Sequence, residues 1–340
     1  VILALLIGTN LSAALSDVIV DAMVAERASA AAAAEGAEGM TATEGEDALQ
    51  TLCWGSLSLG GLVGSGIGIW SASGMASSRI FSITALAPAM ALFSAIVLPE
   101  KCAEGDSSLK AQVSSLVAAL GQPRIYRPLA FFFLLNALVP SASQSMLFFS
   151  TDVLKFSPEF LAAQSMLAYL AFLLGSVIYS RFISGISFNS IFFYSQAALV
   201  ILSLGDLFLV LRLNVRFGIP DAAFVVGSDS VATIISRLTL QPFLVIAARV
   251  CPPGCEAALF AFFMSTFNFG TTVSGIFGTF IAPYFGIGSG EYDGLSKLLA
   301  FRSCCMLIPM FLVRVLLADR SDVSKTDTPG EATQEKTKNE

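Results

Sequence analysis

The sequence contains no histidine among its 340 residues. Histidine is the usual general base near neutral pH and the commonest metal ligand, so Ser-His-Asp and Cys-His catalysis and most zinc sites are excluded. The six cysteines show no CxxC spacing and lie in or beside apolar segments, as buried thiols do. We therefore expect no metal, no cofactor and no enzymatic activity.

Charged residues are also scarce, at 13% of the chain against about 25% in soluble domains, whereas hydrophobic residues make up 55%. This composition excludes a water-soluble protein. The 19 Lys and Arg are balanced by 25 Asp and Glu, so the chain lacks the strongly basic surface that nucleic-acid binding needs. We expect this protein to lie in a lipid bilayer and to bind no nucleic acid.

About nine apolar stretches reach the length of about 20 residues that a helix needs to cross a bilayer. The breaks between them are short and contain proline and glycine, so consecutive helices are expected to be antiparallel neighbours. The sequence thus predicts an all-α, polytopic membrane protein. The approximate limits of the stretches are 1–26, 51–74, 78–98, 128–150, 158–184, 188–212, 220–248, 255–286 and 292–318.

Small residues recur at every fourth position in the second stretch and again in the eighth. They are Gly60, Gly64 and Gly68, and Gly270, Ser274 and Gly278. The separation of these two sets along the chain matches the length of a six-helix half in transporters built from two parallel halves. The last six stretches then form one complete half and the first three form the end of another. On this interpretation three further spans are expected before Val1.

The segments outside the apolar stretches set the predicted domain limits. Residues 1–98 would be the end of an N-terminal bundle, and within it residues 27–50, rich in Ala, Glu and Gly, are expected to be an acidic loop that is disordered or partly helical. Residues 99–127 form a polar connector, 128–318 the C-terminal six-helix bundle, and 319–340 a charged, disordered tail. Because Lys and Arg are concentrated on the face that holds the connector and the tail, both are expected to be cytoplasmic or stromal.

Ionisable side chains inside apolar spans are candidate functional groups, because each costs about 2.5 to 3.5 kcal/mol on insertion scales. Asn10, Asp17 and Asp21 are spaced by seven and four residues, which places them on one stripe of the first predicted helix. Two carboxylates one turn apart repel each other, which is typical of a proton-coupling site. For Asp21 the alternative is a place at the water interface beside Glu26 and Arg27.

The seventh stretch repeats this pattern with Asp229, Thr233 and Arg237. Eight residues of helix rise about 12 Å, which is too far for a direct ion pair between Asp229 and Arg237. Arg237 is therefore expected to pair with a carboxylate of another helix or to bind an anionic substrate group, with a structural pair as the alternative. Asp206, followed by Arg212 at the membrane edge, is interpreted as an interfacial, structural acid.

Uncharged polar residues mark two further helices. Asn136 and Gln144 flank Pro140, which permits a kink, and Asn268 lies in the eighth stretch. Amide groups offer uncharged donors and acceptors to a ring system with several nitrogens. The alternative is that they serve as hydrogen-bonding contacts between helices.

Four segments combine acids, prolines and glycines in a distinctive way. They are residues 16–24 (SDVIVDAMV), 156–161 (FSPEFL), 218–221 with 227–230 (GIPD, GSDS) and 247–257 (AARVCPPGCEA). These segments resemble the folate-biopterin transporter family, a branch of the major facilitator superfamily, and the resemblance runs from about residue 10 to 315. It implies twelve-span transporters that move folates, pterins or other solutes, coupled to protons, and it places Asp17, Asp21 and Asp229 in family motifs.

Residues and resemblance together predict a monomeric transporter of a folate or pterin that works by alternating access. A phenylalanine-rich cavity would hold the ring, Arg237 would meet the carboxylates of a folate, and protonation of Asp17 or Asp229 would bias the inward or outward state. A facilitator for another organic solute, a membrane-embedded enzyme and a truncated chain that does not transport are the alternatives. The plastid envelope and the plasma membrane are both expected locations.

Overall fold

The computed structural model describes residues 2–34, 42–72, 74–98, 109–183, 185–250, 256–288 and 290–316. Within these ranges the chain is helical apart from short turns, and the β pairing recorded there is a single isolated bridge between Gly288 and Glu291. The prediction of an all-α fold is confirmed.

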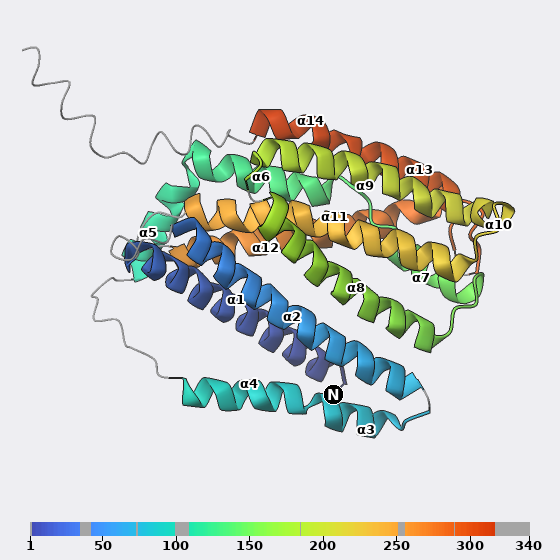
Figure 1. The fold of residues 1–340 in the computed structure, drawn as a ribbon, viewed down its shortest axis with the longest axis horizontal. Coiled ribbons are helices and arrows are strands. Elements are labelled where there is room, and N and C mark those ends of the chain that lie inside the picture. The colour runs from blue at the N-terminus through green and yellow to red at the C-terminus, as the bar shows by residue number, and fades with distance from the viewer. Residues whose placement is uncertain are drawn as a thin grey trace, which may run out of the picture.

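The first part of the chain forms two long helices and two short ones, α1 (Ile2–Ala34), α2 (Ala42–Ala72), α3 (Ser77–Thr84) and α4 (Leu86–Val97). Helices α1 and α2 pack against each other, and α3 and α4 run along the lower edge of the molecule (Figure 1). Within the predicted acidic loop, residues 27–34 and 42–50 are helical. Ala and Glu are abundant there, and both are strong helix formers.

The second part supplies the larger helix group. Its elements are α5 (Leu109–Leu120), α6 (Pro123–Ala137), α7 (Ser143–Asp152), α8 (Pro158–Ile178) with the short π-helix η2 (Tyr179–Ile183), α9 (Phe188–Val210), α10 (Leu213–Arg216), α11 (Asp221–Val250), α12 (Glu256–Ile281) with the 3-10 turn η3 (Ala282–Phe285), α13 (Leu295–Cys305) and α14 (Leu307–Leu316). Helix α5 and the start of α6 occupy most of the described part of the predicted connector, while the predicted tail lies outside the described residues. The two parts meet where α2 packs on α8 and α1 packs on α12 (Figure 1).

Eight of the nine predicted spans are present as helical segments long and apolar enough to cross a bilayer. The fourth, 128–150, is instead divided into α6 and α7 by residues 138–142, which contain Pro140. Helix α12 binds the backbone of this break. The Ser141 amide donates to the Ser274 carbonyl at 3.0 Å, and the Ser274 hydroxyl donates to the Val139 carbonyl at 2.6 Å. A proline break in an apolar helix is tolerated where neighbours bind the freed backbone groups in this way.

Small residues of α12 allow this close contact. A Cβ at Gly278 would collide with the Ser141 carbonyl, and one at Gly270 would lie 2.9 Å from the Phe133 carbonyl oxygen. The small-residue pattern of the eighth stretch is therefore a packing face. In the second stretch the tight approach falls elsewhere, at Gly61, where a Cβ would collide with the Tyr169 ring of α8.

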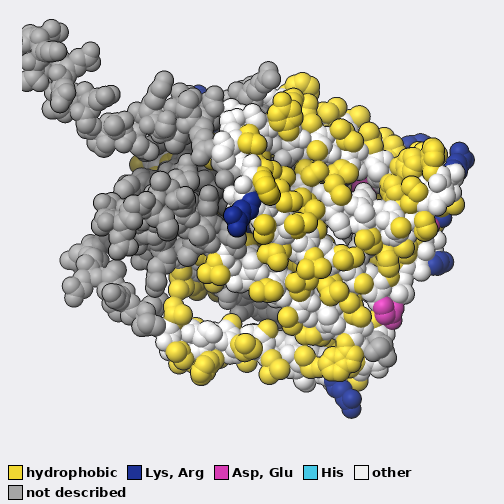
Figure 2. Space-filling model, viewed as in Figure 1, with side chains coloured by type: hydrophobic (Ala, Val, Ile, Leu, Met, Phe, Trp, Pro, Cys, Tyr) yellow, Lys and Arg dark blue, Asp and Glu magenta, His cyan; other side chains and the backbone are white. Residues whose placement is uncertain are grey.

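The outer surface is strongly apolar. Figure 2 shows hydrophobic side chains spread widely over the described part of the visible face, with few charged ones. Exposed leucine, isoleucine, valine and phenylalanine side chains occur on α1, α2, α4, α8 and α9. Exposed apolar surface on this scale needs a covering, and the length of the helices matches a bilayer. The chain is an integral membrane protein.

Candidate functional site

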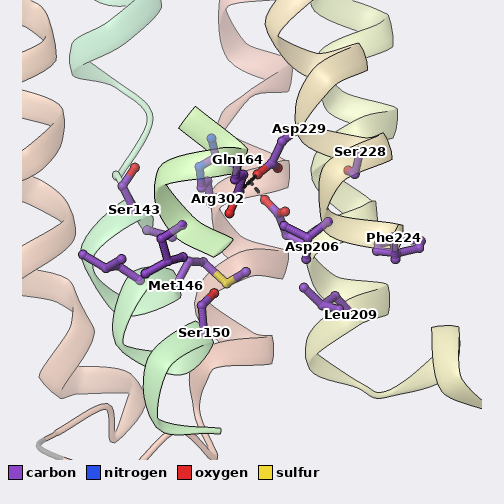
Figure 3. A pocket seen from close by; sticks show the side chains of 14 residues that line it. Ser143, Met146, Ser150, Gln164, Asp206, Leu209, Phe224, Ser228, Asp229 and Arg302 are labelled. Carbon is purple, nitrogen blue, oxygen red and sulfur yellow. Dashed lines mark hydrogen bonds and ion pairs between the residues drawn. The ribbon is translucent and has the colours of Figure 1, made fainter. Parts of the chain in front are cut away.

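A cavity of about 300 Å³ lies inside the second part of the chain, between α7, α8, α9, α11 and α13 (Figure 3). We refer to it as the acidic cavity. Its polar and charged lining residues are Ser143, Ser150, Gln164, Asp206, Ser228, Asp229 and Arg302. A set of ionisable groups facing one another inside an apolar helix bundle is costly and therefore marks a functional site.

Two glycines bring the helices of this cavity close together. A Cβ at Gly175 of α8 would lie 2.9 Å from the Arg237 Cβ and 3.0 Å from the Ile234 carbonyl oxygen of α11. A Cβ at Gly205 of α9 would lie 3.2 Å from the Ser228 hydroxyl oxygen of α11. Helices α8 and α9 can therefore both approach α11, the helix that carries Asp229.

Asp229 and Asp206 point toward the same region of the acidic cavity (Figure 3). The Gln164 side-chain amide donates a hydrogen bond to the Asp229 carboxylate. The nearest oxygen of Asp206 lies 3.9 Å from a guanidinium nitrogen of Arg302, and these side chains are 31% and 27% exposed. The cavity thus holds two carboxylates, one held by a neutral amide and the other facing a cation.

A second cavity of about 230 Å³ lies beside the break between α6 and α7, and we refer to it as the aromatic cavity. Phe132, Phe243 and Phe267 line it together with polar side chains, including Asn136 and Gln196. The Phe243 and Phe267 rings are stacked with centroids 5.5 Å apart. Arg302 is the residue that the linings of the two cavities share.

Arg237 is enclosed where α2, α8 and α11 meet. Its side chain is 1% exposed, and its Nε donates to the Ser176 hydroxyl at 2.8 Å. The guanidinium carbon lies 4.6 Å from the Trp54 ring centroid and 4.4 Å from that of Phe172, within the range of cation–π attraction. Among the described residues neither Nη atom has a hydrogen-bond partner. Arg237 therefore binds Ser176 rather than Asp229, as the predicted 12 Å separation requires.

Four of the predicted candidates differ in whether they line a cavity. Asp229 lines the acidic cavity and Asn136 lines the aromatic cavity. Gln144 on α7 and Asn268 on α12 are exposed and line neither cavity. Asn136 also donates to the Phe132 carbonyl at 3.1 Å within its own helix.

The first helix carries the two remaining predicted carboxylates. Asp17 is exposed on α1, which packs against α2 and α12, and the side chain of Asp21 lies outside the described residues. The role of both acids in substrate binding or proton coupling stays a prediction.

Sequence reasoning did not place Gln164, Asp206 and Arg302 in the candidate site. Asp206, interpreted from the sequence as an interfacial, structural acid, lines the acidic cavity and faces Arg302, whereas Arg212 forms an ion pair with Asp221 at 2.9 Å. The signal for Asp206 and Arg302 was present, since each is an ionisable residue in the middle of an apolar span. Gln164 is an amide in an apolar span, the same signal that singled out Asn136 and Gln144, but it was not selected.

Comparison with known proteins confirms the resemblance. The chain matches the BT1 family over residues 1–337. It is 28% identical to the probable folate-biopterin transporter 4 of Arabidopsis thaliana, over 93% of this chain and 75% of that protein. It is 31% identical to the folate-biopterin transporter of Synechocystis sp., over 95% of this chain and 65% of that protein.

A more distant relative extends the comparison to a parasite. The folate transporter 1 of Plasmodium falciparum is 24% identical, over 71% of this chain and 48% of that protein. The chain spans less than two thirds of the Synechocystis and Plasmodium proteins. Because the family match covers almost every residue, this integral membrane protein belongs to the BT1 family.

Proposed function

We propose that this protein carries folates or pterins across a membrane by alternating access. The observation that carries the proposal is the acidic cavity, in which Asp206, Asp229 and Arg302 face one another inside an otherwise apolar bundle. Relatives over most of the chain are named folate-biopterin transporters. A transporter needs a polar site that lipid does not reach, and a helix bundle with two internal polar cavities provides one.

The proposed movement is a rocking of two helix bundles of the major facilitator type. Residues 1–98 would belong to one bundle and 128–318 to the other, with 99–127 as the connector. The packing of α2 on α8 and of α1 on α12 joins the two groups of helices. The break at 138–142 gives one of these groups a non-helical segment beside the aromatic cavity, a feature typical of transporter helices at substrate sites.

Proton coupling through Asp229 is the second element of the proposal. Its carboxylate accepts a hydrogen bond from Gln164 and shares the acidic cavity with Asp206. Protonation would remove the charge of Asp229 and change the contacts between α8 and α11, which both carry residues of the cavity. Such a change favours one of two packed arrangements.

The other predicted positions remain candidates for substrate binding or coupling. They are Asp17, Asp21, Asn136, Gln144, Arg237 and Asn268. We propose a monomer without enzymatic activity, in the plastid envelope or the plasma membrane. Two relatives are named chloroplastic, which supports the plastid envelope.

The test is uptake of labelled folate, 5-formyltetrahydrofolate and biopterin by cells that express the chain, with empty-vector cells as the baseline. The Synechocystis relative serves as the positive control. A chimera in which this chain replaces the matching region of that relative tests the same helices in a longer protein. We expect uptake above the baseline for at least one of the three solutes. Baseline uptake of all three by chain and chimera would contradict the proposal and favour another organic solute.

A further inference from the structure

Arg302 lines both the acidic and the aromatic cavity. It lies on α13, within an apolar span. Arg237, by contrast, is 1% exposed between two aromatic rings and lines neither cavity. A solute that enters either cavity therefore meets the side chain of Arg302.

The ion pair of Arg302 with Asp206 is loose. Its shortest distance is 3.9 Å, whereas the pair of Arg212 with Asp221 near the end of α9 is 2.9 Å long. Charge-assisted hydrogen bonds between a guanidinium and a carboxylate are typically about 2.7 to 2.9 Å long. Asp206 thus partly balances the charge of Arg302 without engaging its donors closely, which leaves them available to another anion.

The two cavities differ in charge. Asp206 and Asp229 line the acidic cavity and repel an anion that approaches from this side. Among the described residues that line the aromatic cavity, Arg302 is the sole ionisable one, and the rest carry aromatic, aliphatic, thioether, amide or hydroxyl side chains. An anion in the aromatic cavity would meet a guanidinium without a competing carboxylate in the same wall.

We propose that Arg302 binds a carboxylate of the transported solute on the side of the aromatic cavity, and that Asp206 is the partner it leaves when it does so. The inference rests on the proposed function and names the residue that selects carboxylated solutes. The aromatic cavity suits the rest of such a solute, because Phe132, Phe243 and Phe267 offer apolar faces and Asn136 lies in the same wall. A guanidinium fork and a carboxylate match in shape as well as charge.

The inference predicts a difference between two solutes with the same kind of ring. Folates carry a glutamate tail with two carboxylates, whereas biopterin has a pterin ring and an uncharged side chain. Only the folates would use Arg302. Substitution of this residue should therefore weaken folate uptake more than biopterin uptake.

The first variant is Arg302→Gln, assayed for uptake of folate and biopterin at several concentrations. We expect the half-saturating folate concentration to rise about tenfold or more, the effect of losing one charge-assisted hydrogen bond. Biopterin uptake should fall by a clearly smaller factor than folate uptake. Arg302→Lys keeps the charge, so its half-saturating folate concentration should lie between that of the unchanged chain and that of Arg302→Gln.

The second variant, Asp206→Asn, acts in the opposite direction. It frees Arg302 from the carboxylate with which a solute competes, so the half-saturating folate concentration should fall while that for biopterin stays the same. A folding defect lowers uptake of both solutes and cannot produce this gain. Arg212→Gln is the matched control, because it breaks an Arg–Asp pair away from both cavities and should leave both solutes unaffected.

An equal loss of folate and biopterin uptake in Arg302→Gln would overturn the inference, because it would show that Arg302 holds the helices together. Unchanged folate uptake in that variant, or weaker folate uptake in Asp206→Asn, would overturn it as well. If the proposed function itself is wrong, the result differs, because the unsubstituted chain would then take up neither solute. That outcome would remove the inference together with the function on which it rests.

Discussion

Gln164 of α8 donates a hydrogen bond to Asp229 of α11 across the acidic cavity, so a neutral amide holds the carboxylate that we propose for proton coupling. An amide donor has no charge of its own to lose when the acid takes up a proton. The pair can therefore weaken or strengthen with the charge of Asp229 alone. Because the two residues lie on different helices, this change acts directly on the packing of α8 against α11.

The first prediction concerns the pH dependence of transport. In Asp229→Asn the acid is replaced by a neutral side chain of the same shape, so the dependence of folate uptake on pH should become flatter. Uptake by the variant and by the unchanged chain is measured at each pH. Asp221→Asn is the control, because Asp221 lies on the same helix but is bound by Arg212 and Asn214 away from the cavity. An unaltered profile in Asp229→Asn would exclude Asp229 as the coupling group.

The second prediction tests the packing of α12 against the α6–α7 break. In Gly278→Ala the new methyl group meets the backbone carbonyl of Ser141, so we expect a loss of about 1 to 3 kcal/mol in stability. Gly275→Ala is the matched control, because a Cβ at this position meets nothing within 4 Å. Its stability should be unchanged or slightly raised by the better helix propensity of alanine. Thermal unfolding of the two purified variants in detergent measures the difference, and equal values would contradict the packing described above.

Much of this fold could be predicted from local properties of the sequence. The length of the apolar runs identified eight spans, because a helix in a bilayer satisfies its backbone within the segment. The break at 138–142 could not be located in the same way. Pro140 permits a kink, but a full break depends on the Ser274 hydroxyl, which is 135 residues away and binds the Val139 carbonyl.

The candidate site was less predictable than the fold. The cost of a polar group in an apolar helix identified Asp229 and Asn136, since this cost is a property of each position. Pairing between helices is a property of packing, and Gln164 meets Asp229 over a separation of 65 residues. The relation between Asp206 and Arg302 likewise arises only when α9 and α13 come together. Helical spacing says which residues share a face but not which face another helix covers.

A third prediction concerns Ser176, the acceptor for the buried Arg237. Ser176→Ala removes the hydroxyl that binds Nε, and both Nη atoms already lack a partner among the described residues. We expect a loss of about 1 to 3 kcal/mol, the cost of leaving a buried donor unsatisfied. Ser165→Ala is the control on the same helix, since the exposed Ser165 hydroxyl binds the carbonyl of Leu161 in the preceding turn. Thermal unfolding in detergent reports the two values.

A double variant separates this explanation from a general effect of the alanine. Arg237→Met in the Ser176→Ala background replaces the guanidinium with an apolar side chain that needs no partner, so part of the lost stability should return. If the double variant is less stable than Ser176→Ala alone, the cation–π contacts with Trp54 and Phe172 outweigh the unsatisfied donors.

The last prediction concerns the hydrogen bond between the end of α7 and the segment before α13. The Tyr292 hydroxyl donates to an Asp152 carboxylate oxygen at 2.5 Å, and this bond, with smaller effects of burial and of the Asp152 charge, raises the pKa of Tyr292 to about 12. Because the folded-state pKa exceeds the value of about 10 for an unperturbed tyrosine, the bond stabilises the fold fully below pH 10. Its contribution is lost as the pH rises through about 12.

Tyr292→Phe keeps the ring contact with Phe149 and removes only the hydroxyl. Its unfolding temperature should lie below that of the unchanged chain at neutral pH, and the difference should shrink between about pH 10 and 12 as Tyr292 ionises in the unchanged chain. Tyr284→Phe is the control, because this tyrosine lies nearby on η3 and is 89% exposed. If the difference in unfolding temperature stays constant throughout this range, the stabilisation does not come from the hydrogen bond that the Tyr292 hydroxyl donates. Equal unfolding temperatures at neutral pH would show that the bond to Asp152 contributes no stability, and α7 would then be held against α13 by the apolar cluster around Phe149 and Leu298 alone.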